Sequence, residues 1–231
     1  FTTSTLQQEA ANALNFSTQK TMRLAQQLYE GIELKGNGTV GLITYLRTDS
    51  TRISEEADAA ARTYIEAQYG AEYVAERVAA ANDGKKIQDA HEAIRPTDLS
   101  RTPAELKESL GRDQFRLYQL IWKRFAASRM TPARYETTAV RIGAAGYRFH
   151  ASASRLSFDG FRSVYTESED AKEENNVITG KIEPGMELKL SDLDSRQHFT
   201  QPPAHYTEAS LVRALEEKGI GRPSTYAPTI T

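Results

Sequence analysis

The sequence predicts an α+β protein of several domains, in which helices come first, a mainly antiparallel β part follows, and helices return at the end. Apolar residues recur at helical spacing behind capping residues over 1–131 and alternate at strand spacing over 132–200. Helical spacing then resumes over 201–231. A chain of 231 residues suits one large domain or two to three small ones. We therefore expect three domains with these boundaries.

The composition excludes several kinds of protein. Cysteine is absent, which rules out disulfides, thiol catalysis and cysteine-ligated zinc, and no apolar run is long enough for a membrane span. The formal net charge of −2 argues against a nucleic-acid binder that relies on overall charge, although a local basic groove needs only a few cations. No signal-peptide pattern is found, so we expect a cytoplasmic protein. Because the first residue is Phe1 rather than Met, we expect an excised piece of a longer protein.

The first part of the chain predicts two short helices and a hairpin. We expect Ser4 to cap the first helix, and Ser17 to cap a second helix that ends at Gly31. Asn-Gly between the apolar runs 32–34 and 40–44 is a strong hairpin signal. Two helices followed by a hairpin resemble a winged helix-turn-helix, an arrangement often used on DNA. A plain helical hairpin with a β-ribbon has the same pattern.

Three more helices are predicted before the β part. Ser54 caps a helix that ends at Gly70, and Thr102 begins a capping box with proline at the first helical position. A longer helix covers about residues 114–129. We assign its aromatic stripe to the core rather than to a base-stacking platform. The stripe comprises Phe115, Tyr118, Trp122 and Phe125.

The β part and the last helices are marked by turn residues. Residues 136–142 and 147–153 alternate around a glycine-containing turn, which predicts a hairpin. Near the end, Thr207 caps a helix, and residues 221–225 lead into another helix. Further segments are predicted as the short strands 161–166, 176–182 and 186–191 and the solvated acidic loop 167–176.

One candidate site lies in residues 41–50, GLITYLRTDS, where an apolar strand runs into a polar cluster. In an extended backbone Tyr45 and Arg47 face the same side. A tyrosine phenol has an ordinary pKa of about 10, so it attacks poorly at neutral pH unless a cation stabilises the phenolate and the phosphate. The planar guanidinium of Arg47 can do both. A strand-end tyrosine beside an ordinary surface arginine gives the same pattern.

Two further segments contain residues of types that bind phosphate. Residues 89–98 include His91, a candidate proton carrier or phosphate donor, whereas Glu92 and Arg95 can simply pair on a helical turn. In residues 197–226 a helix ends at glycine and another begins behind Ser and Thr next to an arginine, which is a natural phosphate site. A structural histidine and two capped helices without a ligand explain these patterns equally well.

Taken together, the three segments closely resemble the bacterial type IA DNA topoisomerases, the ω-protein class. The resemblance covers essentially the whole chain in the same order, from FTTSTLQQ at residues 1–8 to GRPSTY at residues 221–226. Three long motifs in the right order are highly specific. We therefore favour the functional interpretation of each motif over the structural one.

The resemblance implies a role for each matching residue. Tyr45 matches the nucleophile, which forms a 5′-phosphotyrosine link, and Arg47 matches the arginine that holds the scissile phosphate. His91 matches a histidine with an assisting role near the cleavage site. The helical part would be the lid domain, the β part the arch that hinges it, and the last helices the edge of the base domain. DNA-binding residues that line the single-strand groove are matched by Gly221, Arg222, Ser224 and Thr225.

Some family features are changed or have no match. Leu46 stands where methionine is commoner, and His205 stands where the family usually has a cation, which puts a backbone contact there in doubt. The family's Mg²⁺ ligands form an acidic cluster in an N-terminal toprim domain, which this sequence does not contain. We therefore expect Mg²⁺ in the full enzyme, no metal ligand in this chain, and a partial β arch with exposed sheet edges.

The implied parent enzyme cleaves one DNA strand through Tyr45, passes another strand and reseals the break, which relaxes negatively supercoiled DNA without ATP. Its partners would be single-stranded or underwound DNA and the toprim domain of the same protein, at the bacterial nucleoid. As an isolated fragment, the chain could instead be a non-catalytic single-stranded DNA-binding module, and covalent capture of DNA distinguishes the two. A tyrosine recombinase is disfavoured, because it needs several arginines and histidines around a tyrosine near the C-terminus.

Overall fold

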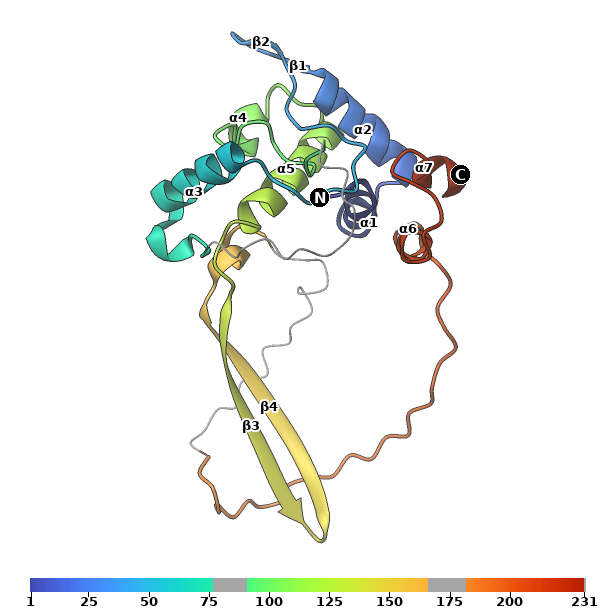
Figure 1. Ribbon diagram of the computed structural model, residues 1–231. Helices are drawn as coiled ribbons and strands as arrows, with labels where there is room; N and C mark the ends of the chain where they lie inside the picture. Colours follow the sequence, from blue (N-terminus) through green and yellow to red (C-terminus); the bar gives the residue numbers. More distant parts are fainter. Residues whose placement is uncertain (77–90, 166–181, 231) are drawn as a thin grey trace.

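A computed structural model of the chain describes residues 1–76, 91–165 and 182–230, which form a helical body with one long β-hairpin extending from it (Figure 1). Within these ranges there are seven α-helices and two separate two-stranded antiparallel sheets, so the predicted α+β class is confirmed. In chain order the elements are α1 (Thr3–Leu14), α2 (Thr18–Glu30), β1 (Ile32–Leu34), β2 (Gly38–Val40), α3 (Glu55–Tyr69), η1 (Ala71–Tyr73), α4 (Pro103–Leu106), α5 (Arg112–Ala127), β3 (Arg134–Ala144), β4 (Tyr147–Phe158), η2 (Gly160–Ser163), α6 (Glu208–Glu217) and α7 (Tyr226–Ile230).

Helices α1 and α2 form as predicted, but α1 has a different cap. The side chain of Thr2, rather than that of Ser4, accepts a hydrogen bond from the amide of Thr5 and caps the helix. Several hydroxyl residues follow one another here, and only Thr2 combines an extended backbone with the right distance to a free helical amide. Ser17 caps α2 and Gly31 ends it, as expected.

The predicted β1–β2 hairpin is present but shorter than expected. The two strands pair antiparallel, with Leu34 opposite Gly38. The second strand ends at Val40, because the chain then leaves β1, and beyond this point Ile43 forms an isolated bridge with Pro96. The residues before Tyr45 therefore run beside a different part of the chain, which the hairpin pattern did not predict.

Helix α5 carries the aromatic part of the core between α1, α2 and α4. Tyr118 and Trp122 are buried, and both satisfy their polar atoms on the loop before α4. The hydroxyl of Tyr118 donates to the carbonyl oxygen of Arg101 at 2.7 Å, and the indole N–H of Trp122 donates to that of Leu99 at 2.9 Å. These contacts confirm that the aromatic stripe belongs to the core. The predicted capping box of Thr102 is also formed.

Helix α3 begins behind Ser54 and ends at Gly70, as predicted, and a charged network fixes it to the end of α5. The Asp58 carboxylate accepts from Nε of Arg62 at 2.7 Å and from Nη1 of Arg129 at 2.9 Å. Burial raises the pKa of Asp58, but the hydrogen bonds and charges of the two arginines outweigh burial and hold that pKa below its ordinary value.

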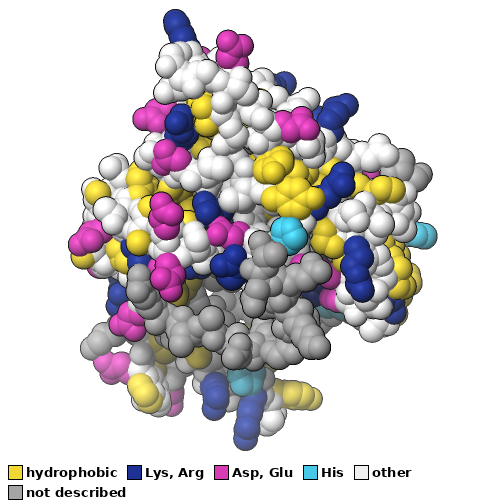
Figure 2. Space-filling model, turned by 45° about the horizontal axis from the view of Figure 1, so that its top comes forward, with side chains coloured by type: hydrophobic (Ala, Val, Ile, Leu, Met, Phe, Trp, Pro, Cys, Tyr) yellow, Lys and Arg dark blue, Asp and Glu magenta, His cyan; other side chains and the backbone are white. Residues whose placement is uncertain are grey.

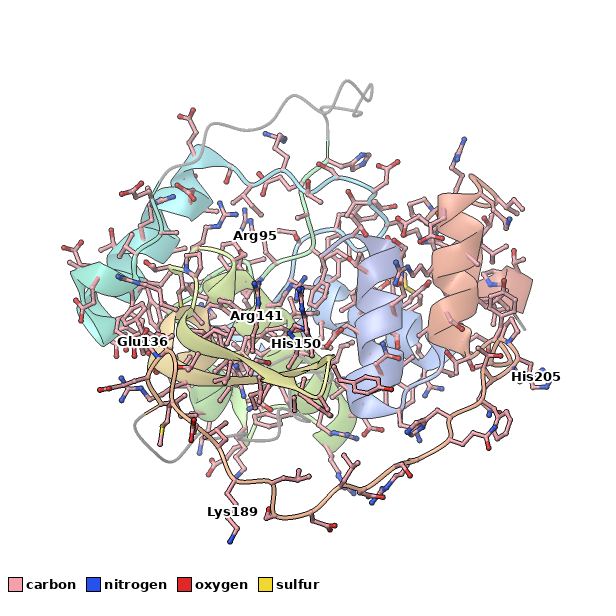
Figure 3. The ribbon with its side chains drawn as sticks, turned by 90° about the horizontal axis from the view of Figure 1, so that it is seen from below. Arg95, Glu136, Arg141, His150, Lys189 and His205 are labelled. Carbon is pink, nitrogen blue, oxygen red and sulfur yellow. The ribbon has the colours of Figure 1, made fainter. Side chains whose placement is uncertain are left out.

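Strands β3 and β4 form one long hairpin that extends beyond both predicted segments. The register places Arg141 directly opposite His150, and Figure 3 shows the two residues side by side on the hairpin. Most side chains of both strands are exposed, because no other strand in the described ranges pairs with them. The hairpin therefore has two open edges.

The strand predicted at 161–166 is wrong, because η2 and a turn occupy residues 160–164. Gly160 has a φ of +49°, and a Cβ there would lie 2.3 Å from the carbonyl oxygen of Thr131. The chain turns back sharply at this glycine. Val164 and Tyr165 then enter the core of the helical body instead of extending the sheet.

The strand predicted at 186–191 is also wrong, because residues 182–206 contain neither helix nor strand. Met186, Leu188 and Leu190 alternate as a strand requires but are exposed. No described strand lies alongside to supply hydrogen bonds, and an unpaired extended segment does not make a sheet. In Figure 1 this segment passes the far end of the hairpin and returns to α6. Outside the described residues lie the acidic loop 167–176 and all but the last residue of the predicted strand 176–182.

Helices α6 and α7 pack on the first two helices, with α6 against α1 and α7 against α2 (Figure 1). Thr207 caps α6 as predicted. The carboxylate of Glu208 accepts from the amide of Thr18 at 2.7 Å, and the hydroxyl of Ser4 donates to Glu216 at 2.6 Å. The chain thus returns to its own beginning. None of the described helices is long and apolar enough to cross a membrane.

Candidate active site

Residues 41–50, which contain the predicted nucleophile, are held on one side by residues 93–97. The amide of Thr44 donates to the carbonyl oxygen of Arg95 at 2.9 Å, and its hydroxyl donates to that of Ala93 at 2.7 Å. The amide of Arg95 donates back to the Thr44 hydroxyl at 3.0 Å. This antiparallel contact brings the second predicted motif next to the first.

The start of α1 holds the same segment on its other side. The amide of Thr3 donates to the carbonyl oxygen of Thr48 at 2.9 Å. Its hydroxyl donates to the carbonyl oxygen of Leu46 at 2.7 Å and accepts from the amide of Thr48 at 2.9 Å. Thr3 is fully buried. One threonine therefore fixes the backbone on both sides of Arg47.

Side chains of this segment alternate between the core and the solvent. Leu46 and Thr48 are buried, whereas Tyr45 is 40% exposed and Arg47 and Asp49 are exposed. This alternation is what an extended backbone produces, so Tyr45 and Arg47 both reach solvent while Leu46 anchors the backbone between them. Leu46 is 1% exposed and packs in the core of the helical body.

The Tyr45 ring lies between two other aromatic rings. His91 stacks on it with a centroid distance of 5.6 Å and an interplanar angle of 26°. Tyr29, near the end of α2, meets it edge-on with a centroid distance of 5.5 Å and an angle of 68°. On the face turned forward in Figure 2, a histidine lies against a cluster of hydrophobic side chains, with a cationic side chain beside them. The sequence singled out Tyr45 and His91 but missed Tyr29, for which its spacing gave no signal.

The arginines of the first two motifs differ in their surroundings. Nη2 of Arg95 pairs with Glu92 at 2.8 Å and is mostly buried, so the simple ion pair considered for these residues is formed, although no helix surrounds it. Arg47 is exposed and makes no ion pair within residues 1–76, 91–165 and 182–230. Its guanidinium fork is therefore available to an anion beside Tyr45.

The third motif lies near the acidic end of the first. Burial raises the pKa of the Tyr226 phenol, the carboxylates of Glu216 and Asp49 raise it further, and the guanidinium of Arg222 opposes them. The start of α1 links the two motifs, because Thr3 accepts from the amide of Thr48 and the neighbouring Ser4 donates to Glu216 of α6. Arg222 and Ser224 are exposed, so the turn before α7 faces solvent.

The turn at the start of α7 is closed by its own residues. The amide of Arg222 donates to the hydroxyl of Thr225 at 2.8 Å, and the amide of Thr225 donates to the carbonyl oxygen of Arg222 at 2.8 Å. The amide of Arg222 is thus bonded within the turn that precedes α7. His205 lies apart from this turn at the edge of the molecule and is exposed (Figure 3).

Acidic side chains do not gather into a metal site in the part of the chain that the structure describes. No group of three or more His, Asp or Glu residues there could hold a metal ion. The carboxylate of Glu92, next to His91 in the chain, is paired with Arg95. The described residues therefore do not fit a Mg²⁺ site.

Comparison with known proteins identifies the class to which the chain belongs. The sequence profile of the DNA topoisomerase family matches residues 1–231. The structure of full-length topoisomerase I from Thermotoga maritima matches with a TM-score of 0.78 and 43% sequence identity, over 100% of this chain and 36% of that chain. The class is therefore that of the DNA topoisomerases. Within it, the chain belongs to the bacterial type IA family, as its three motifs predicted, and it spans about a third of the length of that relative.

Proposed function

We propose that this chain supplies the nucleophile and the phosphate-binding arginine of a type IA topoisomerase, which relaxes negatively supercoiled DNA without ATP through a 5′-phosphotyrosine intermediate. The observation that carries the proposal is the joint exposure of Tyr45 and Arg47 on a segment whose backbone is fixed from two sides. A fixed backbone holds a nucleophile and a cation in a constant relation, which is the main requirement for phosphoryl transfer.

In the proposed reaction the phenol oxygen of Tyr45 attacks the phosphorus of a DNA phosphodiester. The bond from phosphorus to the 3′-oxygen breaks, the 3′-oxygen takes up a proton, and the 5′-phosphate remains as a diester on the tyrosine. The guanidinium of Arg47 balances the charge that grows on the phosphate oxygens, and His91 assists beside the ring. Attack by the 3′-hydroxyl reverses each step, so the bond energy is conserved and no ATP is consumed.

The proposal also assigns DNA contacts to the start of α7. Arg222 and Ser224 are exposed in the turn before α7, which packs against α2, the helix that carries Tyr29 next to Tyr45. Few cations are proposed to contact phosphate and the net charge is −2, so we expect single-strand binding that is weak and weakens further with salt. The same residues would line the groove of a base domain at 201–231, with a winged-helix-like lid at 1–131 and an arch at 132–200. The groove residues are Gly221, Arg222, Ser224 and Thr225.

Mg²⁺, when bound, would neutralise charge on the reacting phosphate. We place its ligands in the toprim domain of the full-length protein, because the described residues offer no group of acids for it. The chain of 231 residues alone is then expected to fold but not to relax DNA. The full-length protein would act in the cytoplasm, at the nucleoid.

Covalent capture of DNA tests the proposal. The full-length protein is incubated with a single-stranded oligonucleotide and Mg²⁺, and protein–DNA adducts that survive denaturant are counted. We expect Tyr45→Phe to abolish the adduct, whereas Tyr147→Phe, which alters another well-exposed tyrosine on β4, leaves it unchanged. An adduct formed by Tyr45→Phe would exclude Tyr45 as the nucleophile. Oligonucleotide binding without any adduct in either protein would favour a non-catalytic DNA-binding module.

A further inference from the structure

Tyr29 is the neighbour of Tyr45 that no sequence motif indicated. It lies one residue before the last residue of α2, and the β1–β2 hairpin separates it from Tyr45 in the chain. Its side chain is 39% exposed, so part of its ring reaches solvent beside Tyr45. An exposed aromatic residue that contacts a reactive side chain calls for an explanation other than core packing.

The backbone holds Tyr29 in a constant position relative to the tyrosine segment. The amide of Leu42 donates to the carbonyl oxygen of Leu28 at 2.8 Å, and both leucines are fully buried. A Cβ at Gly41 would lie 2.8 Å from the carbonyl oxygen of Tyr29, so only glycine allows these two segments of the backbone to approach this closely. The end of α2 and the start of the tyrosine segment are therefore bonded and packed directly against each other.

The two neighbouring rings limit the ring of Tyr45 in different ways. His91 lies along its face with an interplanar angle of 26°, and Tyr29 meets it edge-on at 68°. Edge-on and stacked contacts are both preferred aromatic geometries, and each favours the contacting rotamer over its alternatives by a factor of about 2 to 10. A half-exposed tyrosine without such contacts would sample other rotamers.

We propose that Tyr29 is a positioning residue, whose ring edge holds the Tyr45 ring in the orientation from which its phenol oxygen attacks DNA. The inference rests on the proposed role of Tyr45 as the nucleophile. Attack must be in line with the leaving 3′-oxygen, so the fraction of time that Tyr45 spends in one rotamer sets the rate directly. The ring of Tyr29 matters in this role and its hydroxyl does not.

The test measures single-turnover adduct formation by the full-length protein at saturating oligonucleotide, with the dissociation constant of the oligonucleotide measured separately. Tyr29→Leu, which keeps apolar bulk but removes the aromatic edge, should lower the rate about 3- to 10-fold and leave the dissociation constant within about twofold. Tyr29→Phe should keep the wild-type rate. Tyr69→Leu is the matched control, because Tyr69 also ends a helix before a glycine and contacts another tyrosine ring, that of Tyr73.

A spectroscopic measurement on the 231-residue chain checks the orientation without DNA. With fluorotyrosine incorporated, the ¹⁹F resonance that disappears in Tyr45→Phe belongs to Tyr45. It should shift in Tyr29→Leu, because the ring current of Tyr29 is lost, and broaden as Tyr45 samples more rotamers; it should not change in Tyr69→Leu.

Three results would overturn the inference: a wild-type rate in Tyr29→Leu, a loss in Tyr29→Phe equal to that in Tyr29→Leu, or a loss that resides only in the dissociation constant. These outcomes are distinct from failure of the proposed function. That failure would show itself as an adduct formed by Tyr45→Phe, whatever residue occupies position 29.

Discussion

The hydroxyl of Thr3 makes the side-chain hydrogen bonds that hold the backbone on both sides of Arg47. The substitution Thr3→Val removes this hydroxyl and keeps the volume of the side chain. In the native protein this hydroxyl donates to the carbonyl oxygen of Leu46 and accepts from the amide of Thr48. Both residues are buried, so water cannot replace the lost partner. Two buried groups left unpaired at about 1–3 kcal/mol each predict a loss of about 2–6 kcal/mol in the free energy of unfolding.

Thr21→Val is the matched control for this change. Thr21 is also fully buried, and its hydroxyl donates to the carbonyl oxygen of Ser17 at 2.9 Å. That oxygen also accepts the amide of Thr21 at 2.9 Å, so it keeps a partner when the hydroxyl is removed. We therefore expect a loss below about 1 kcal/mol.

Urea unfolding of the chain, followed by circular dichroism of its helices, measures both losses. In the full-length protein, Thr3→Val should also slow adduct formation, because Arg47 is no longer held beside Tyr45, whereas Thr21→Val should not. Both variants lose a buried hydroxyl, but only Thr3→Val leaves buried backbone groups unpaired. Equal losses of stability in the two variants would therefore show that unpaired groups are not the cause.

Two other predictions concern charged residues. Arg47→Lys in the full-length protein should slow cleavage by about 10- to 100-fold, because an ammonium cannot replace the bidentate fork, while its unfolding free energy stays within about 0.5 kcal/mol of wild type. Unchanged cleavage in a folded variant would remove Arg47 from the site. Asp58→Asn should cost about 1.5–3 kcal/mol at pH 7 by weakening its bonds to Arg62 and Arg129. Because the pKa of Asp58 is lowered, its contribution is complete above the ordinary aspartate pKa and is lost as the pH falls through the lower folded value. A difference between wild type and variant that stayed constant down to pH 2 in urea titrations would contradict this.

Much of the fold follows from signals that act within a few residues. Ser17, Ser54, Thr102 and Thr207 each cap the helix that the sequence predicted, because capping joins a side chain to an amide within the same turn. The aromatic stripe of α5 lies in the core, since helical periodicity determines which residues share a face. Two errors at this level, the cap of α1 and the strand at 161–166, arose where several hydroxyls compete or where one glycine turns the chain.

The sequence also predicted the family correctly, because the order and spacing of motifs can be recognised without knowing the fold. The arrangement of the site did not. Apolar alternation at 186–191 could not tell whether a partner strand would be present, and among the described residues none is. A strand forms only when another segment supplies hydrogen-bond partners, and the sequence of the strand itself does not show whether that segment is present.

By itself the sequence predicted which residues carry the chemistry: Tyr45 and Arg47 at extended spacing, and a histidine and an arginine in two later motifs. Only the tertiary structure decided their neighbours. It tied the tyrosine segment to Thr3, stacked His91 on Tyr45, and brought Tyr29 against the same ring. Such contacts join parts of the chain that are far apart in sequence, and they form because burying Leu42, Leu46 and their partners in one core compensates the entropy of closing the loops between them.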